Sequence, residues 1–461
     1  MVLNIEVDSR KIKKGDTFIA LRGISSDGHD YIDKAIENGA SKLIVEEKGN
    51  YNIPYEVVKD TRKYLVNYLK ENYGKYINEL KLVGFTGTNG KTTSAFLLYT
   101  ALNDLNIKTS YIGTVGFYIE KKISALTNTT PDILELYKML LTSYEEGCKY
   151  VCMEVSSQGL SYNRLEGLEF DYAIFTNLTQ DHLDYHKTME NYALAKQQLF
   201  KKIKPNGTAI VNYDDNYKDY YLLENNNNVT YGFNGGDYKI DKYIPTNLGT
   251  IISYTHNNST YNLSSLLIGK YNTYNLLTTI VVLDLIGIGY SSLKKTIEVL
   301  KAPIGRMETI IYNNNSIVID YAHTPDAVEK IITTMKEVTK GNIYTIFGCT
   351  GDRDRTKRPI MMKLVTDLSK YVIVTSDDLH NEDPKQIVND MLKENKNNNF
   401  EVIMDRGNAI KKGISLLKEN DTLLILGKGH EEYIIVGDNK IPFQDFKVVQ
   451  ELIEGNRNLV K

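Results

Sequence analysis

The sequence predicts an α/β protein of three domains, and three observations lead to that prediction. Short apolar runs typical of strands alternate with helical stretches along nearly the whole chain, without a repeat of fixed period. Many of these runs end in polar residues, as strands do at the ligand-binding edge of a doubly wound sheet. The chain has 461 residues, which exceeds one hydrophobic core and corresponds to about three domains.

We expect the first domain to span residues 1–80 and to be a small α/β unit. Its elements in order are strand-like "DTFIAL", helical "YIDKAIENGA", strand-like "SKLIVEE" and a long helix over "TRKYLVNYLKENYGKYI".

The second domain, residues 81–303, is expected to be a doubly wound domain like those of P-loop ATPases. Its buried-looking strands are "KLVGFTG", "YVCMEV", "YAIFTNL" and "GTAIVNYDD". The third domain, residues 304–461, repeats the pattern with "IVIDYAHTPDA", "IYTIFGCTGDRDR", "YVIVTSDD" and "TLLILGKGHEEY". Polar residues follow each of these strands, which favours a Rossmann-like domain with a second site at its strand ends.

A candidate phosphate-binding loop follows the first strand of the second domain, in "VGFTGTNGKTTSAF" at residues 83–96. A phosphate cradle needs inward-pointing backbone N–H groups, a helix N-terminus and a cation. Gly87 and Gly90 allow the tight turn, Lys91 supplies the charge, and Thr92 offers a hydroxyl to Mg²⁺. The usual P-loop spacing would require glycine where Phe85 stands, so the motif alone leaves an ordinary strand-to-helix turn as the alternative.

Composition narrows the function classes. Hydrophobic residues make up 42%, charged residues 25%, and the net charge is -3, so neither nucleic acid nor an anionic membrane is an expected partner. The apolar runs are too short to span a bilayer and the N-terminus lacks a signal-peptide apolar core, which favours a cytoplasmic protein. The three cysteines lie in or beside apolar stretches and are expected to be buried free thiols: Cys148, Cys152 and Cys349.

Six of the seven histidines occur in polar clusters at strand ends or in loops. His182 and His186 have the spacing of a helical zinc pair, but no third soft ligand is near them in the sequence. Glu154 and Asp181 are hard oxygen donors, which favours the Mg²⁺ that accompanies a nucleoside triphosphate.

Ten stretches, taken in order, resemble the Mur ligases, and specifically the UDP-N-acetylmuramoyl-tripeptide synthetases. They are "DSRKIKKGDTFIAL" with "DGHDYI", "GTNGKTT", "NTTPD", "MEVSSQGL", "FTNLTQDHLDYHKTMENYALAKQQLF", "GKYNTYN", "APIGRME", "DYAHTPDA", "FGCTGDRDRTKRP" and "LGKGHEEY". The phosphate loop of this family is T-G-T-N-G-K-T-T, so Phe85 follows the family's own spacing.

The resemblance implies an ATP-dependent acid–amino-acid ligase of peptidoglycan synthesis, and hence a part in cell-wall biogenesis, cell shape and cell division. Such an enzyme joins an amino acid to the D-glutamate carboxylate of UDP-N-acetylmuramoyl-L-alanyl-D-glutamate. An acyl phosphate forms from ATP, and the products include ADP and phosphate. The implied partners are ATP with Mg²⁺, the UDP-muramoyl dipeptide and a free amino acid, and the expected oligomeric state is a monomer.

The resemblance also implies roles for individual residues. The catalytic set is Lys91, Glu154, His182 and Lys196. The metal set is Thr92, Glu154, His182 and Lys196. By pattern alone Lys196 would be a solvated helix lysine, but the family carbamylates this lysine to N6-carboxylysine. Carbamylation needs a neutral amine, and therefore a lowered lysine pKa.

Three further sets follow from the resemblance. Positions expected to bind ATP are Gly87, Thr88, Asn89, Gly90, Lys91, Thr92, Thr93, Asn272, Asn275, Arg306 and Asp320. Positions expected to bind the UDP-linked substrate are Ser9, Arg10, Asp27, Gly28, His29, Thr129, Thr130, Ser156 and Arg164. Positions expected to bind the incoming amino acid are Arg353, Asp378, His380, Gly427 and Glu431.

The amino acid that is added depends on the stretch "DDLHNEDP". In this family a D-N-P-R stretch commonly accompanies meso-diaminopimelate, whose distal carboxylate is bound by the arginine. Here His380 replaces that arginine, and Asp377 and Asp378 add negative charge. This charge argument predicts a diamino acid without a distal carboxylate, L-lysine or L-ornithine, over meso-diaminopimelate.

Two other classes of function remain open at this point. One is another ligase of the superfamily, such as a folylpolyglutamate synthetase, against which the "DSR", "DGH" and "GDRD" motifs argue. The other is a nonenzymatic nucleotide-binding paralogue, against which the intact Lys91, Glu154, His182 and Lys196 argue. Phosphate release that requires both a UDP-muramoyl dipeptide and an amino acid would separate the three.

Overall fold

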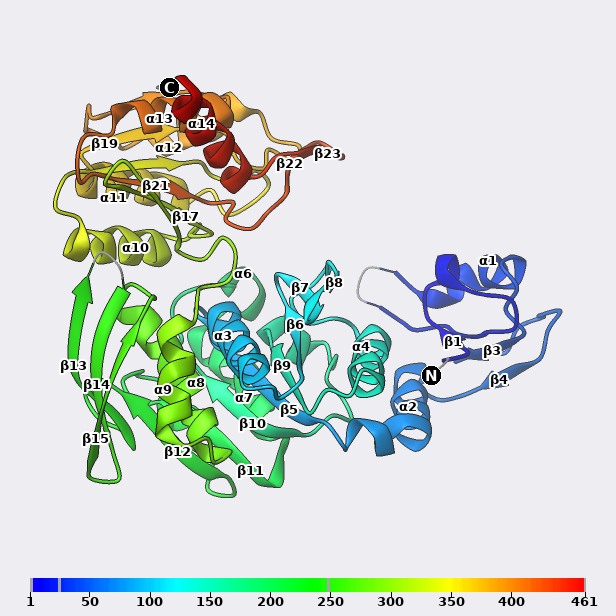
Figure 1. The fold of residues 1–461 in the computed structure, drawn as a ribbon. Helices are drawn as coiled ribbons and strands as arrows, with labels where there is room; N and C mark the ends of the chain where they lie inside the picture. The colour runs from blue at the N-terminus through cyan, green and yellow to red at the C-terminus, as the bar shows by residue number, and fades with distance from the viewer. Residues whose placement is uncertain (1–2, 24–25, 247–248, 460–461) are drawn as a thin grey trace.

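A computed structural model describes residues 3–23, 26–246 and 249–459, and it confirms a three-domain α/β architecture (Figure 1). The N-terminal sheet lies at one end of the central domain, near α4, and the C-terminal sheet lies over its other end, beyond β13–β15 (Figure 1). The predicted domain boundaries, residues 1–80, 81–303 and 304–461, stay predictions.

The N-terminal part is a parallel four-stranded sheet in the order β1-β2-β3-β4. The predicted strands and helices are present there. Its elements are β1 Ile5–Glu6, η1 Ser9–Lys11, β2 Thr17–Ile19, η2 Gly28–Tyr31, α1 Ile32–Glu37, β3 Lys42–Val45, β4 Tyr55–Val57 and α2 Thr61–Ile77. Phe18, Ala35 and Leu43 form part of a small core between the sheet and α1.

The central part is an eleven-stranded sheet in the order β15-β14-β13-β12-β11-β10-β5-β9-β6-β7-β8. The strands are β5 Lys81–Thr86, β6 Thr109–Gly113, β7 Gly116–Ile119, β8 Lys121–Ser124, β9 Tyr150–Glu154, β10 Phe170–Phe175, β11 Ile203–Asn212, β12 Asn227–Gly232, β13 Tyr238–Thr246, β14 Gly249–His256 and β15 Ser259–Ser265. The helices are α3 Lys91–Asp104, α4 Ile133–Glu145, α5 Ser157–Ser161, α6 Leu183–His186, α7 Met189–Phe200, α8 Lys270–Leu285 and α9 Tyr290–Val299, with a short turn η3 Lys218–Tyr220.

The predicted doubly wound pattern holds for the middle of this sheet, where β12, β11, β10, β5, β9 and β6 run parallel. The antiparallel additions at both edges were not predicted. Strands such as β15 alternate polar and apolar residues, which is typical of a sheet with one solvated face and differs from the continuous apolar runs of the parallel strands.

The C-terminal part is a six-stranded sheet in the order β16-β17-β21-β18-β19-β20, parallel except for the edge strand β16. Its strands are β16 Glu308–Tyr312, β17 Asn315–Asp320, β18 Ile343–Phe347, β19 Tyr371–Val374, β20 Phe400–Val402 and β21 Thr422–Leu426, with a hairpin of β22 Tyr433–Val436 and β23 Asn439–Pro442. Its helices are α10 Pro325–Val338, α11 Lys357–Leu368, α12 Pro384–Leu392, α13 Arg406–Leu416 and α14 Asp445–Leu459.

Two further expectations from the sequence can be compared with the structure. All three cysteines are free and buried, as predicted. Within the described ranges, no helix combines the length and the apolar character needed to cross a bilayer.

A buried ion pair joins two helices of the C-terminal domain. Arg406, at the start of α13, donates from Nε and Nη2 to both carboxylate oxygens of Asp445 at 2.7 and 2.8 Å, and both side chains are fully buried. Nη2 also donates to the Leu426 carbonyl at the end of β21. The pair therefore ties α14 to the strand end that carries part of the candidate site.

Arg406→Met is expected to lower the free energy of unfolding of this domain by about 3–5 kcal/mol, because it leaves Asp445 charged and unpaired in the interior. The double variant R406M/D445L should recover much of that loss. Urea unfolding followed by circular dichroism would measure both. A double variant as unstable as the sum of the two single variants would contradict this account of the pair.

Candidate active site

The loop between β5 and α3 has a backbone that only glycine accommodates at two positions. Gly87 has φ +148° and Gly90 has φ +87°. A Cβ at Gly87 would lie 2.0 Å from Thr176 Oγ1, and one at Gly90 would lie 2.4 Å from Asn275 Oδ1. The loop is thus pressed against β10 and α8, with the α3 N-terminus directly behind it, as a phosphate cradle requires.

Two lysines converge on this loop. Lys91 Nζ donates to the carbonyls of Gly87 and Thr88 at 2.9 and 2.8 Å, and Lys196 Nζ, on α7, donates to the same Gly87 oxygen at 2.8 Å. Burial lowers the pKa of Lys91. Burial, reinforced by the positive charge of Lys91, lowers the pKa of Lys196 well below its ordinary value. The sequence pattern alone would have left Lys196 solvated, but its side chain is buried.

The carboxylate of Glu154, at the end of β9, is buried and accepts four hydrogen bonds. Tyr111 Oη and the Thr114 N–H donate to Oε1 at 2.5 and 2.7 Å. Thr92 Oγ1 and Thr114 Oγ1 donate to Oε2 at 2.8 and 3.2 Å. Glu154 is therefore directly connected to the phosphate loop through Thr92.

Two members of the predicted metal set, Thr92 and Glu154, carry donor atoms suited to a hard cation. Thr92 and Glu154 are in direct contact, and hydroxyl and carboxylate oxygens are donors that Mg²⁺ prefers. The other two members of the set, Lys196 and His182, both lie near the Tyr192 ring. Lys196 Nζ is 4.4 Å from the centroid of that ring, and the centroid of the His182 ring is 6.1 Å from it. His182 has φ +53°, and its Nε2 lies 3.5 Å from Asp181.

His186 has different surroundings from His182 despite their helical spacing. Its ring is buried, stacks on Tyr192 and makes a 2.9 Å hydrogen bond with Ser157 Oγ. These contacts place it in the packing between α5, α6 and α7.

The other residues predicted to bind ATP lie on two sides of the loop. Asn272 and Asn275 are buried on α8, where Asn275 Nδ2 donates to Asn272 Oδ1, and Asn275 Oδ1 accepts from Ser94 Oγ. Thr93 is buried on α3. On the loop itself, Thr88 Oγ1 donates to the Thr179 carbonyl. These contacts hold the loop and the residues packed against it in place.

From the other side, the C-terminal domain reaches the loop. Arg306 Nη2 lies 3.5 Å from Thr92 Oγ1, its guanidinium covers the Tyr321 ring, and its Nε is buried with no hydrogen-bond partner among the described residues. Asn89 Nδ2 donates to Asp326, on α10, at 3.1 Å. Asp320 accepts the Met307 and Ala322 N–H groups, and burial raises its pKa.

Four of the predicted substrate positions form one network beside Glu154. Thr130 Oγ1 donates to the Glu154 carbonyl and accepts from the Ser156 N–H. Arg164 Nη1 donates to the Thr130 carbonyl at 2.8 Å, while its Nε is buried with no partner among the described residues. Thr129 Oγ1 lies 3.1 Å from Thr114 Oγ1.

The predicted UDP positions lie in two short turns that both pack on α1. Asp8 caps the first turn, in which Ser9 is buried and Arg10 is exposed and paired with Asp8. Asp27 caps the second turn and contacts His29 Nδ1 at 2.6 Å. A Cβ at Gly28 would lie 2.7 Å from the Leu21 nitrogen, so this turn also needs its glycine.

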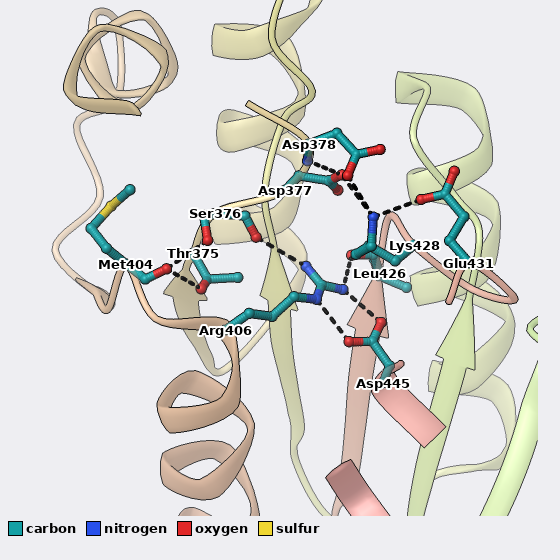
Figure 2. Close-up of polar contacts among 10 residues, drawn as sticks. All are labelled: Thr375, Ser376, Asp377, Asp378, Met404, Arg406, Leu426, Lys428, Glu431 and Asp445. Carbon is teal, nitrogen blue, oxygen red and sulfur yellow. Dashed lines mark hydrogen bonds and ion pairs between the residues drawn. The ribbon is translucent and has the colours of Figure 1, made fainter. Parts of the chain in front are cut away.

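Two of the predicted amino-acid positions, Asp378 and Glu431, lie beside Lys428 beyond the ends of β19 and β21 (Figure 2). Lys428 Nζ is fully buried and donates to Asp378 at 2.8 Å and to Glu431 at 2.7 Å, and it lies 4.0 Å from Asp377. Burial alone would lower the pKa of Lys428. The negative charges of Asp377 and Glu431 act in the opposite direction, and the net effect is a raised pKa of Lys428. Burial raises the pKa of Glu431.

The other amino-acid positions border this cluster. Gly427 has φ +111°, and a Cβ there would lie 2.4 Å from Asp377 Oδ2. His380 has φ +48° and is joined to the β22–β23 hairpin by backbone hydrogen bonds. Arg353 is exposed on the loop after β18, whose Gly351 N–H donates to the Asp378 carbonyl.

The structure corrects one premise drawn from the sequence. We expected Asp377 and Asp378 to present unbalanced negative charge to the incoming side chain. Asp378 is instead buried and paired with Lys428, and it also accepts the Ile435 N–H. The premise that Asp378 is an unbalanced charge is therefore wrong.

Sequence reasoning missed three residues of the site: Tyr111, Thr114 and Lys428. Lys428 stands between two glycines in the motif "LGKGHEEY", and that position was a usable signal. Tyr111 is one of 34 tyrosines and lies inside an ordinary strand, so nothing in the sequence distinguishes it.

Family models match nearly the whole chain. The Mur ligase family catalytic domain matches residues 2–84, the Mur ligase middle domain residues 85–283, and the Mur ligase glutamate ligase domain residues 305–429. The chain is 41% identical over 461 residues to a Clostridium botulinum UDP-N-acetylmuramoyl-L-alanyl-D-glutamate–2,6-diaminopimelate ligase, covering 98% of this chain and 95% of that one. It is 42% identical to the Fusobacterium nucleatum protein of the same name, covering 97% and 93%.

Solved structures of Mur ligases have the same fold as this chain. A UDP-N-acetylmuramoyl-L-alanyl-D-glutamate–2,6-diaminopimelate ligase superposes with a TM-score of 0.71 at 30% identity, covering 99% of this chain and 95% of that one. The MurF ligase of Thermotoga maritima in complex with ADP has the same fold, with a TM-score of 0.71 at 20% identity over 99% and 98% of the two chains. From these matches and the geometry above, this chain belongs to the Mur ligase family.

Proposed function

We propose that this protein is the ATP-dependent ligase that adds 2,6-diaminopimelate to UDP-N-acetylmuramoyl-L-alanyl-D-glutamate in peptidoglycan synthesis. The observation that carries the proposal is the convergence of Lys91, Lys196, Thr92 and Glu154 on one phosphate loop. The relatives that match the whole chain at about 40% identity carry this activity in their names.

The reaction follows from the weakness of a carboxylate as an electrophile. An oxygen of the D-glutamate carboxylate attacks the γ-phosphorus of ATP, the bond to the β-γ bridging oxygen breaks, and ADP leaves. The amine then attacks the acyl phosphate carbon, the amine loses a proton, and the tetrahedral intermediate collapses with release of phosphate. Alignment and charge neutralisation account for most of the catalysis.

The residues of the loop have distinct tasks in this scheme. Among the described residues, Lys91 donates only to carbonyls of its own loop, so its ammonium can turn to phosphate oxygens when ATP binds. Arg306 brings a charge from the C-terminal domain to the same place. Mg²⁺, held by Thr92 and Glu154 and supported by His182 and modified Lys196, would supply further charge neutralisation at the phosphates.

We propose that Lys196 is carbamylated. The amine must be neutral to add to CO₂, and burial beside Lys91 favours the neutral form. The product is an anion, which would pair with Lys91 and support a cation site.

The buried acidic cluster favours a diamino acid. Three carboxylates surround one ammonium at Lys428, so the cluster keeps a net negative charge and can receive the distal ammonium of the substrate. Because Asp378 is paired with Lys428, its own charge no longer argues against a distal carboxylate. The names of the relatives support 2,6-diaminopimelate over L-lysine or L-ornithine.

The alternatives are weaker. A Mycobacterium tuberculosis folylpolyglutamate synthase shares the fold, but at 14% identity and over 78% of this chain. A nonenzymatic role would not explain why Lys91 and Lys196 are both buried at the loop. We place the reaction in the cytoplasm, where ATP and UDP-linked precursors are available, and we keep a monomer as our prediction.

Lys91→Ala is expected to abolish most activity, about 100-fold or more, because its ammonium neutralises phosphate charge as the γ-phosphoryl group is transferred. ADP formation dependent on both the UDP-muramoyl dipeptide and diaminopimelate is the measurement. Lys187→Ala, a change of the same type beyond α6, is the matched control. Near-parent activity in K91A would exclude this loop as the phosphate site.

Lys196→Ala is expected to be nearly inactive and to be partly restored by acetate or formate, since a small carboxylate can occupy the place of the carbamate. Native mass spectrometry in the presence of CO₂ should find one added carbamate on the parent and none on K196A. Full activity in K196A without a rescuing acid would end this assignment.

The amino acid can be tested with a panel of meso-diaminopimelate, L-lysine and L-ornithine. We expect kcat/KM for meso-diaminopimelate to exceed the others by at least about tenfold, or roughly 1.4 kcal/mol. His380→Arg, which restores the D-N-P-R arginine, should raise the value for diaminopimelate and leave that for lysine unchanged. A preference for L-lysine in the parent would reinstate the original expectation from the sequence.

A further inference from the structure

We propose that Tyr111 is a positioning residue for the cation site. Its hydroxyl holds one oxygen of Glu154, so that the other oxygen is presented to the divalent cation. The inference rests on the proposed function and adds to it a residue outside the family motifs noted in the sequence.

Strand register brings the two residues together. β6 and β9 are parallel neighbours in which Tyr111 is paired with Cys152. Glu154 lies two residues after Cys152 and therefore on the same face of the sheet. The Tyr111 hydroxyl reaches Glu154 Oε1 at 2.5 Å.

Gly113 leaves the space in which this contact forms. A Cβ there would lie 2.4 Å from Tyr111 Oη and 2.3 Å from Glu154 Oε1. Any larger residue would push the hydroxyl and the carboxylate apart. Gly113 has no positive φ in this structure, so its small size, and not its backbone freedom, is what the position requires.

An aromatic wall fixes the Tyr111 ring. The ring is fully buried, and its centroid lies 5.3 Å from that of Phe96, 6.1 Å from Tyr99 and 5.9 Å from Tyr118. The contacts with Phe96 and Tyr118 are edge-to-face, the arrangement that aromatic quadrupoles favour. The hydroxyl therefore has little freedom to follow Glu154 if the carboxylate rotates.

The two oxygens of Glu154 then have separate tasks. Oε1 accepts from Tyr111 and from the Thr114 N–H, two donors that belong to β6 and the turn after it. Oε2 accepts from Thr92, the phosphate-loop hydroxyl expected to bind the cation, and from Thr114 Oγ1. Thr92 and Glu154 would hold the cation, and the two donors on Oε1 would keep the carboxylate in its present orientation.

Without Tyr111, Oε1 would keep only the Thr114 N–H as a donor, and the carboxylate would be held less firmly in its present orientation. Groups that orient a metal ligand typically contribute about 10–100-fold to metal affinity. The Tyr111 hydroxyl is such a group, and no packing argument requires it, since phenylalanine would fill the same space against the aromatic wall.

The test is Tyr111→Phe, which removes the hydroxyl and keeps the ring. Mn²⁺ binding to the enzyme with a nonhydrolysable ATP analogue, followed by electron paramagnetic resonance, should weaken by about tenfold. The Mg²⁺ concentration for half-maximal ADP formation should rise in parallel, with kcat at saturating Mg²⁺ within about twofold of the parent. Tyr118→Phe is the matched control: it makes the same change within the same aromatic wall and should leave both values unaltered.

An unchanged Mn²⁺ affinity in Y111F would overturn the proposal. So would a fall in kcat at every Mg²⁺ concentration without a shift in the half-maximal concentration, because that is the mark of a general structural defect. Circular dichroism would verify that both variants are folded. Weakened Mn²⁺ binding in Y111F, together with a parent that forms no ADP from the proposed substrates, would support this inference and refute the proposed function.

Discussion

The site depends on a single constraint, the accumulation of positive charge around the carbonyl oxygen of Gly87. The buried Nζ groups of two lysines, Lys91 and Lys196, donate to this oxygen. Such an arrangement is unfavourable for two full charges in a poorly solvated place. It becomes favourable when an anion arrives, whether a phosphate group or a carbamate on Lys196. The loop thus offers a favourable place for negative charge.

The same constraint explains why the surrounding backbone is rigid. Gly87 and Gly90 adopt left-handed conformations against Thr176 and Asn275, which leave no room for a side chain. Asn272 and Ser94 complete the support through hydrogen bonds to Asn275. A loop fixed in this way holds its N–H groups in place without reorganisation, which is the condition under which fixed dipoles stabilise charge most effectively.

Coupling between the domains also passes through the loop. Arg306 comes from the start of the C-terminal domain and approaches Thr92, while Asp326 on α10 accepts from Asn89. These two contacts link the C-terminal domain to the phosphate loop. In the cluster around Lys428, the buried ammonium hydrogen-bonds to Asp378 and Glu431, so the charge balance and the geometry of the cluster depend on each other.

The sequence by itself determined the parallel α/β framework, the phosphate loop and the family. Buried parallel strands are continuous apolar runs, and a phosphate loop has obligatory glycines and a lysine within a few residues, so local patterns identify both. The antiparallel edges of the central sheet were missed because their alternating strands resemble polar surface segments. Two properties became visible only in the tertiary structure. Burial and the nearby Lys91 lower the pKa of Lys196 and favour its neutral form. The charge of Asp378 is balanced by a lysine that lies 50 residues later in the sequence. The contact of Tyr111 with Glu154, 43 residues apart, likewise depends on the register of two strands. Charge balance and desolvation are sums over neighbours in space, and a linear pattern does not contain those neighbours.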